Sequence, residues 1–350
     1  MSIDASKLSG ARRKPAPAFS LLRAAILRPE FTALISTIAV FLFFAIVAGN
    51  AGFLTFVGTR NYLQVAAMIG IVGTPITLLL VAGEFDLSVG TMIGAAGVIV
   101  AYPIVNLGWP LWAATGLGLG VAALVGIING LLIVRVNIPS FLVTLGMMFV
   151  LRGLGLAGSL IIAGTTQVFG IKAKLAGDPL LHLFAGTLFD LPVSIYWWVG
   201  LALLGAHVLG NTRFGNWILA AGGDRDAAAK MGIPVARVKI ILYVLTAMAA
   251  VLVGMLNMFY VDMADVGQGL GKEFEGITAA VVGGTAITGG LGSPIGTVIG
   301  ALMFGMISQG FFYTDINDSW FYAIVGGMLL AAVVINTYAR RAALLQRGRK

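Results

Sequence analysis

The chain has 350 residues, of which 59% are hydrophobic and 10% are charged. Soluble domains carry about 25% charged residues, so the composition excludes an ordinary soluble protein and indicates an integral membrane protein. The absence of cysteine and the presence of only two histidines, His182 and His207, exclude disulfides, cysteine nucleophiles, thiolate metal sites and multi-histidine metal sites. We therefore expect no metal site.

Residues 1–30 are polar and basic, and we expect a cytoplasmic N-terminal segment there. The apolar run 31–49 is too long for the core of a typical signal peptide, so it predicts a retained first helix. An all-α integral membrane protein of about ten transmembrane helices follows, with a permease body over 31–338 and a basic cytoplasmic tail over 339–350. The further spans are predicted at 61–82, 88–106, 111–134, 140–163, 193–210, 240–261, 277–289, 294–313 and 319–338.

The segment 277–289 is shorter than the roughly 17 residues needed to cross a bilayer. Its assignment stays open between a full span and a half-helix. Ten spans place both termini on one side, and most Lys and Arg residues fall on that side, which indicates the cytoplasm by the positive-inside rule. The net charge of +8 follows this membrane pattern and does not indicate nucleic-acid binding. Of the Lys and Arg residues, only four fall on the side opposite the termini: Arg60, Lys172, Lys174 and Lys272.

The connection 211–239 between two predicted spans concentrates charge, and its centre predicts a short capped helix. Asp224 is suited to cap the start, and Gly232 is suited to end the helix. Asp226 in the first turn and Lys230 in the last form an i, i+4 pair of favourable order. A helix of about two turns does not persist alone in water, so we expect it to lie against another surface.

Arg152 is the only charge well inside a predicted span. On a helical wheel Phe141, Thr144, Met148 and Arg152 fall within about 80° of one another and form one semi-polar stripe. A charge at mid-bilayer is costly, so Arg152 should face protein or water. Two interpretations remain open: Arg152 snorkels or binds a main-chain carbonyl, or the stripe belongs to a translocation path.

Glycines repeat every four residues at four places: Gly90 with Gly94, Gly116 with Gly120, Gly126 with Gly130, and Gly292 with Gly296 and Gly300. In lipid, small residues at this spacing allow helix backbones to approach closely. We therefore expect tight helix packing at all four places.

Three motifs follow one another along the chain: VAGEFDLSVG (81–90), NIPSFLVTLG (137–146) and KEFEGITAAVVGGT (272–285). Their order and spacing resemble the ribose/xylose/galactose-type permeases of ATP-binding-cassette (ABC) importers, and the resemblance runs from about residue 60 to 338. In the first motif this chain has Glu84 and Phe85 where the family usually has a glycine and an aliphatic residue. The extra carboxylate predicts a substrate subgroup. The family positions in this motif are Asp86, Leu87, Ser88 and Gly90.

The resemblance implies a vitamin-B12-importer-like (type II) helical fold and two permease copies around a central path. It also implies a cytoplasmic ATPase and a periplasmic or extracellular solute-binding protein. In such permeases a short cytoplasmic helix fits a cleft in the ATPase; a solvated structural loop is the alternative here. The coupling role falls on Gly223, Asp224, Asp226, Ala227, Ala228, Lys230, Gly232 and Ile233.

Nothing in the sequence predicts ATP hydrolysis by this chain. The nearest approach to a phosphate loop, GQGLGK (267–272), lacks the required spacing and is followed by Glu273 where Ser or Thr would bind magnesium. We expect no cofactor in this chain, with ATP and magnesium held by the partner ATPase. A partner that changes shape on binding ATP would then move the cytoplasmic helix.

Four carboxylates fall in loops predicted on the outer side. We expect them to dock basic residues of the binding protein, which would affect association rate and salt dependence; ordinary solubilising charge is the alternative. These residues are Asp262, Asp265, Glu273 and Glu275.

The leading interpretation is a multi-pass permease subunit in a bacterial plasma membrane, surrounded by lipid, that imports a monosaccharide or similar small polar solute. An ion-coupled secondary transporter is the first rival. It would need an ionisable or cation-coordinating site near mid-membrane, and no Asp or Glu falls in the middle of a predicted span. A membrane-embedded enzyme is the second rival, and it lacks a nucleophile–base pair or a metal cluster.

Overall fold

The computed structural model describes residues 29–314, 317 and 319–347, and most of them are helical. The helices are α2 (Pro29–Val47), η2 (Gly49–Phe53), α3 (Phe56–Val81), α4 (Ser88–Leu107), α5 (Leu111–Arg135), α6 (Ser140–Ala163), α7 (Ile171–Lys174), η3 (Pro179–Leu183), α8 (Val193–Asn211), α9 (Arg213–Gly223), α10 (Arg225–Lys230), α11 (Val235–Val261), α12 (Lys272–Val282), α13 (Pro294–Phe312) and α14 (Trp320–Arg347). The strands are β1 (Gln167–Phe169), β2 (Thr187–Leu188), β3 (Leu191–Pro192) and β4 (Met263–Asp265).

Among the described residues, seven helices are long and apolar enough to cross a membrane: α3, α4, α5, α6, α8, α11 and α13. All ten predicted spans contain a helix. In α2 and α14, however, the apolar stretches are shorter, Ala33–Val47 and Ala323–Val334. The chain is therefore a mostly helical multi-pass membrane protein.

Helix α12 resolves the question left open for the eighth segment. It has 11 residues, about 16 Å at 1.5 Å per residue, which is roughly half of a 30 Å hydrocarbon core. The helix ends at Val282, and it packs on α3, α13 and α14. Its contact with α3 is tight, because a Cβ added to Gly276 would lie 2.8 Å from Cδ1 of Ile76. The eighth segment is a half-helix.

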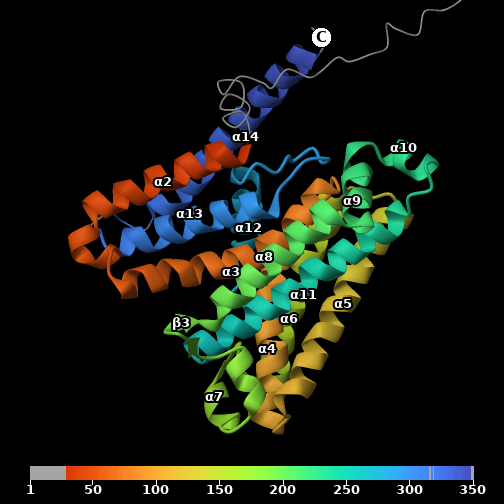
Figure 1. The fold of residues 1–350 in the computed structure, drawn as a ribbon. Helices are drawn as coiled ribbons and strands as arrows, with labels where there is room; N and C mark the ends of the chain where they lie inside the picture. Colours follow the sequence, from red (N-terminus) through yellow and green to blue (C-terminus); the bar gives the residue numbers. More distant parts are fainter. Residues whose placement is uncertain (1–28, 315–316, 318, 348–350) are drawn as a thin grey trace, which may run out of the picture.

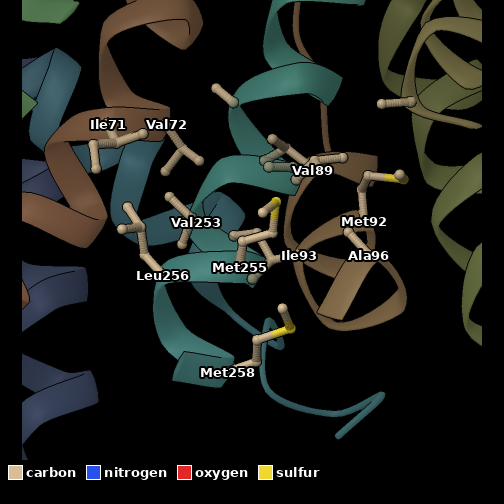
Figure 2. Packing of buried hydrophobic residues seen from close by; sticks show 14 of the residues in the cluster. Ile71, Val72, Val89, Met92, Ile93, Ala96, Val253, Met255, Leu256 and Met258 are labelled. Atoms are coloured by element: carbon tan, nitrogen blue, oxygen red, sulfur yellow. The ribbon is translucent and has the colours of Figure 1, made fainter. Parts of the chain in front are cut away.

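Helix α11 lies at the centre of the fold, between α3 and α4 (Figure 2). Burial of its apolar side chains on both flanks supplies the main cohesion of this part of the molecule, together with close packing. The labelled core residues are Ile71 and Val72 on α3, Val89, Met92, Ile93 and Ala96 on α4, and Val253, Met255, Leu256 and Met258 on α11.

Most of the glycine repeats mark close approaches, as predicted, but the expectation for Gly116 and Gly120 is wrong, because a Cβ added to either would meet nothing within 4 Å. On α5, a Cβ added to Gly126 would lie 2.5 Å from Cα of Val244, and one added to Gly130 would lie 2.8 Å from Cα of Ile240. On α13, Gly296 and Gly300 leave no room for a side chain against main-chain atoms of α12 and its C-terminal cap. Small residues therefore set the distance between these backbones.

The two ends of the molecule differ in structure (Figure 1). One end, here called the α10 end, has α9 and α10. The opposite end, the α7 end, has short elements between the long helices, including the antiparallel pairs β1–β4 and β2–β3. Helix α9 was not predicted from the sequence, although Phe214, Trp217, Ile218 and Ala221 follow the spacing of one helical face.

Some predicted segments lie outside the described residues. These are residues 1–28 of the N-terminal segment, and Arg349 and Lys350 of the tail. The predicted boundary at residue 338 is not a structural break, since α14 continues to Arg347.

Candidate functional site

The connection from α3 to α4, here called the 84–88 segment, holds the first motif. Gly83 ends α3 with a φ of 79°, a left-handed conformation that glycine adopts without a steric penalty. The main-chain N–H of Glu84 still donates to Leu79 at 3.1 Å. From there the chain has no regular secondary structure until α4 begins at Ser88.

One face of α11 binds this segment over three successive positions. Lys239 forms an ion pair with Glu84. One turn later, the Tyr243 hydroxyl donates to the main-chain oxygen of Phe85 at 3.0 Å. Thr246, about three turns into α11, donates from its hydroxyl to Oδ2 of Asp86 at 2.8 Å.

Helices α5 and α6 bind the same segment from other sides. Asn129 on α5 donates from Nδ2 to Oγ of Ser88 at 3.1 Å. Ser140, the first residue of α6, accepts the main-chain N–H of Phe85 at 3.2 Å. Within the segment, the main-chain N–H and hydroxyl of Ser88 donate to Oδ1 of Asp86 at 2.9 and 2.6 Å. The 84–88 segment therefore joins α5, α6 and α11.

The Glu84–Lys239 pair is buried, with residue exposures of 7% and 5%. Losing one member of a buried pair costs about 3–5 kcal/mol, because the other charge is left uncompensated. The sequence placed Lys239 at the end of the connection 211–239, but Lys239 lies within α11 and is buried. Glu84 is likewise not a free carboxylate, since Lys239 neutralises it.

Helix α10 matches the predicted capped helix. Oδ1 of Asp224 accepts the main-chain N–H groups of Asp226 and Ala227 at 3.0 and 2.9 Å, and Lys230 is the last residue. Gly232 adopts a φ of 81° just after it, which is typical of a glycine that follows a helix. The cap and the glycine set the two boundaries.

Two contacts hold helix α10 on the bundle: its buried side packs on neighbouring residues, and one exposed side chain forms a hydrogen bond. Ala228 is buried in a small cluster with Ala221 of α9 and Val235, the first residue of α11. Arg225 donates from Nη2 to Oδ1 of Asn137, between α5 and α6, at 3.2 Å. The helix thus connects α9, α11 and the α5–α6 connection.

The end of α3, the end of α9 and the connection between α12 and α13 meet in a contact made largely by glycines. Gly222, near the end of α9, packs directly on the main-chain oxygen of Val81 at the end of α3. Gly290, between α12 and α13, donates its N–H to that oxygen at 2.8 Å. Gly289 lies against both Gly222 and Gly83. Side chains at these positions would push apart elements that meet backbone to backbone.

Three of the four carboxylates predicted to dock a binding protein are at least partly accessible: Asp262 and Asp265 at the α7 end, and Glu275 in the first turn of α12. Oδ1 of Asp262 accepts the main-chain N–H of Lys172 at 2.9 Å. Asp265 accepts an N–H within its own turn at 2.6 Å. Glu275 pairs with Lys272 at 2.7 Å. Docking by these three residues stays a prediction.

The fourth carboxylate, Glu273, does not lie on a surface. It is 4% exposed, because the half-helix α12 places it against Gly90 in the first turn of α4. Its Oε2 has no hydrogen-bond partner among the described residues. A side chain in this position does not present its charge to a docking protein, so the expectation for Glu273 is corrected.

The predicted stripe on α6 does not form a single exposed face. Phe141 and Arg152 are exposed and Met148 is half-buried, but Thr144 is fully buried and donates its hydroxyl to the main-chain oxygen of Ser140 at 2.8 Å. Thr144 therefore packs within this chain. A translocation role for the stripe stays a prediction.

The chain that forms this arrangement is similar to known proteins. The sequence pattern of the family described as "Branched-chain amino acid transport system / permease component" matches residues 58–333. The chain belongs to this family. The match covers the body from the first turn of α3 to α14, including the 84–88 segment and α10.

Several curated relatives are sugar permeases by name. The chain is 31% identical to the fructose import permease protein FrcC of Rhizobium meliloti, covering 90% of this chain and 87% of the relative. It is 30% identical to the xylose/arabinose import permease protein XylH of Sulfolobus acidocaldarius, covering 90% and 86%. It is 30% identical to the ribose import permease protein RbsC of Escherichia coli K12, covering 86% and 92%. No solved structure matches the chain.

Family membership, and not the distribution of charge, separates the competing interpretations. No Asp or Glu falls in the middle of a predicted span, but the structure buries Glu84, Asp86 and Glu273 near helix ends, so the positions of the carboxylates do not separate a secondary transporter from other permeases. The family and the named relatives are permease components of transport systems, and this identifies the chain as a membrane permease.

Proposed function

We propose that this chain is the membrane subunit of an ATP-driven importer that moves a monosaccharide, or a similarly small polar solute, into the cytoplasm. Relatives named for fructose, xylose/arabinose and ribose, each similar over most of the chain, support a sugar as the solute. The name of the family mentions branched-chain amino acids, so these are the second solute class to test.

The capped helix α10 is the observation on which the contact with a separate ATPase rests. Ala228 anchors it, while Ala227 and Ala229 are exposed and small, which allows close seating in a cleft. ATP and magnesium are held by that partner, and its change of shape on binding ATP shifts α10 as a rigid body. The contact surface is formed by Gly223, Asp224, Asp226, Ala227, Lys230, Gly232 and Ile233, supported by Ala228.

The remaining architecture follows the same proposal. The α10 end faces the cytoplasm of a bacterial cell, both termini lie on that side of the plasma membrane, and lipid surrounds a type II permease body of about ten helical segments. Two copies of the chain enclose the path, with Phe141, Met148 and Arg152 of α6 directed toward it. A solute-binding protein docks through Asp262 and Asp265 at the α7 end and through Glu275 at the start of α12.

Uptake into proteoliposomes tests the function. The chain is reconstituted with its ATPase and solute-binding protein, and radiolabelled fructose, ribose, xylose, arabinose and leucine are offered in turn. We expect accumulation of one sugar that requires ATP and persists when an uncoupler dissipates the proton gradient. Accumulation that an uncoupler abolishes at constant ATP would instead show that the chain is a secondary transporter. Accumulation of leucine alone would show that the solute is a branched-chain amino acid and not a sugar.

A further inference from the structure

The buried ion pair between Lys239 of α11 and Glu84 of the α3–α4 connection has no role in the functions assigned above. Resting on the proposed importer function, we propose that Glu84 and Lys239 are positioning residues for coupling: they transmit displacement of α10 to the 84–88 segment and thereby to the start of α4.

The first part of the route runs from α10 to Lys239. The N–H of Ile233 donates to Ala228 at 3.1 Å, and that of Gly232 donates to Ala229 at 3.0 Å, so the turn after α10 is fixed to it. Val235 packs on Ala228, and α11 begins there. Lys239 lies about one turn further, so a shift of α10 reaches its side chain through a hydrogen-bonded turn and one helical turn.

The second part runs from Glu84 into the bundle. The bonds of Tyr243 and Thr246 to Phe85 and Asp86 keep the segment parallel to α11 over its length. Asp86 in turn binds Ser88, where α4 begins. The start of α4 therefore follows α11 as long as these contacts hold.

A charged pair suits this position better than an apolar contact. Apolar side chains tolerate sliding, because burial is not directional. A buried ion pair tolerates little sliding, since separation leaves two uncompensated charges in a poorly solvated place. The pair thus fixes one register between α11 and the 84–88 segment.

The test compares solute moved per ATP hydrolysed in proteoliposomes that contain the chain, its ATPase, its binding protein and the radiolabelled sugar that the wild type accumulates. In the variant Glu84→Met/Lys239→Met, the pair is replaced by two unbranched apolar side chains, so no buried charge is left alone. We expect an unchanged melting temperature and a solute-to-ATP ratio lower by at least about fivefold, the lower end of typical coupling between sites.

The matched control is Thr77→Val/Thr297→Val, which removes a buried hydroxyl pair 2.5 Å apart between α3 and α13. We expect it to keep the wild-type ratio, which would show that loss of any buried polar pair is not enough. The charge-exchanged variant Glu84→Lys/Lys239→Glu should recover part of the lost ratio.

A wild-type ratio in the methionine variant would overturn the inference while leaving the importer function intact. If the methionine variant does not fold, Glu84→Gln/Lys239→Gln decides: it removes both charges but keeps polar side chains in their place, and an unchanged ratio would equally contradict the proposal. A wild type without ATP-dependent uptake would overturn the proposed function and this inference together.

Discussion

The hydroxyl of Tyr243 donates to the main-chain oxygen of Phe85 at 3.0 Å, across 158 positions of sequence. The contact lies one helical turn beyond the Lys239–Glu84 pair, and both residues are at least partly buried. It holds the middle of the 84–88 segment on α11, and its strength is open to direct measurement.

Replacing Tyr243 with Phe should destabilise the chain by about 1–3 kcal/mol, because the oxygen of Phe85 loses its side-chain donor in a buried place. Thermal unfolding of the detergent-purified chain measures the effect. Tyr196 offers a control, since its hydroxyl also donates to a main-chain oxygen, that of Leu188 at 2.7 Å, but at an exposed position. Tyr196→Phe should change the melting temperature much less; equal losses would show that burial is not the cause.

Replacing Gly222 with Ala should lower the melting temperature clearly, because a Cβ there meets the main-chain oxygen of Val81 and the N–H of Gly290. Main-chain atoms cannot rotate away as a side chain can, so α9 must move off α3. Gly210→Ala in α8 is the control, since a Cβ there meets nothing within 4 Å. A stable Gly222→Ala variant would show that this junction tolerates separation.

Replacing Asp224 with Ala should loosen α10 by about 1 kcal/mol, the usual value of a lost N-cap. Hydrogen exchange at the amides of Asp226 and Ala227 reports it, because both donate to Oδ1 of Asp224. We expect faster exchange at these two amides, and slower exchange again in Asp224→Asn, which restores an acceptor. Unchanged exchange in the alanine variant would show that the fold, not the cap, holds the helix.

Neutralising Asp262, Asp265 and Glu275 together should slow association of the binding protein at low salt, with the difference fading as ionic strength rises. Adding Glu273→Gln to this variant should have no further effect on the association rate, since Glu273 is buried. Surface plasmon resonance at several salt concentrations measures both. A salt-independent rate in the triple variant would assign these residues to solubility alone.

The sequence was sufficient for features that depend on neighbouring residues. Asp224 and Gly232 lie within nine positions of each other, and their cap and stop chemistry predicted α10. The length of the eighth apolar segment likewise indicated that it was too short to cross a membrane. It did not decide between a full span and a half-helix, and the predicted start of the segment lies five residues after the start of α12.

Features that join distant parts of the chain were beyond the sequence. Lys239 and Glu84 are 155 positions apart, and each alone resembled a charge at a membrane boundary. Glu273 was expected on a surface because no local pattern shows that a half-helix returns it to the start of α4. The signal in the sequence was the spacing of Lys239, Tyr243 and Thr246, which places three polar side chains on one face of α11. Polar residues at such a spacing within an apolar helix indicate that this face binds a polar part of the chain.

If the helices respond to ATP through α10, a bulky group on this helix should abolish the response, and a single thiol can be placed there because the chain has no cysteine. Ala227→Cys places one thiol on the exposed face of α10, and uptake is measured in proteoliposomes assembled before and after reaction with a bulky maleimide. We expect normal ATP-dependent uptake with the unlabelled thiol and none after labelling, with the melting temperature unchanged. Labelled protein that still accumulates sugar at the normal rate would show that α10 does not carry the response to ATP.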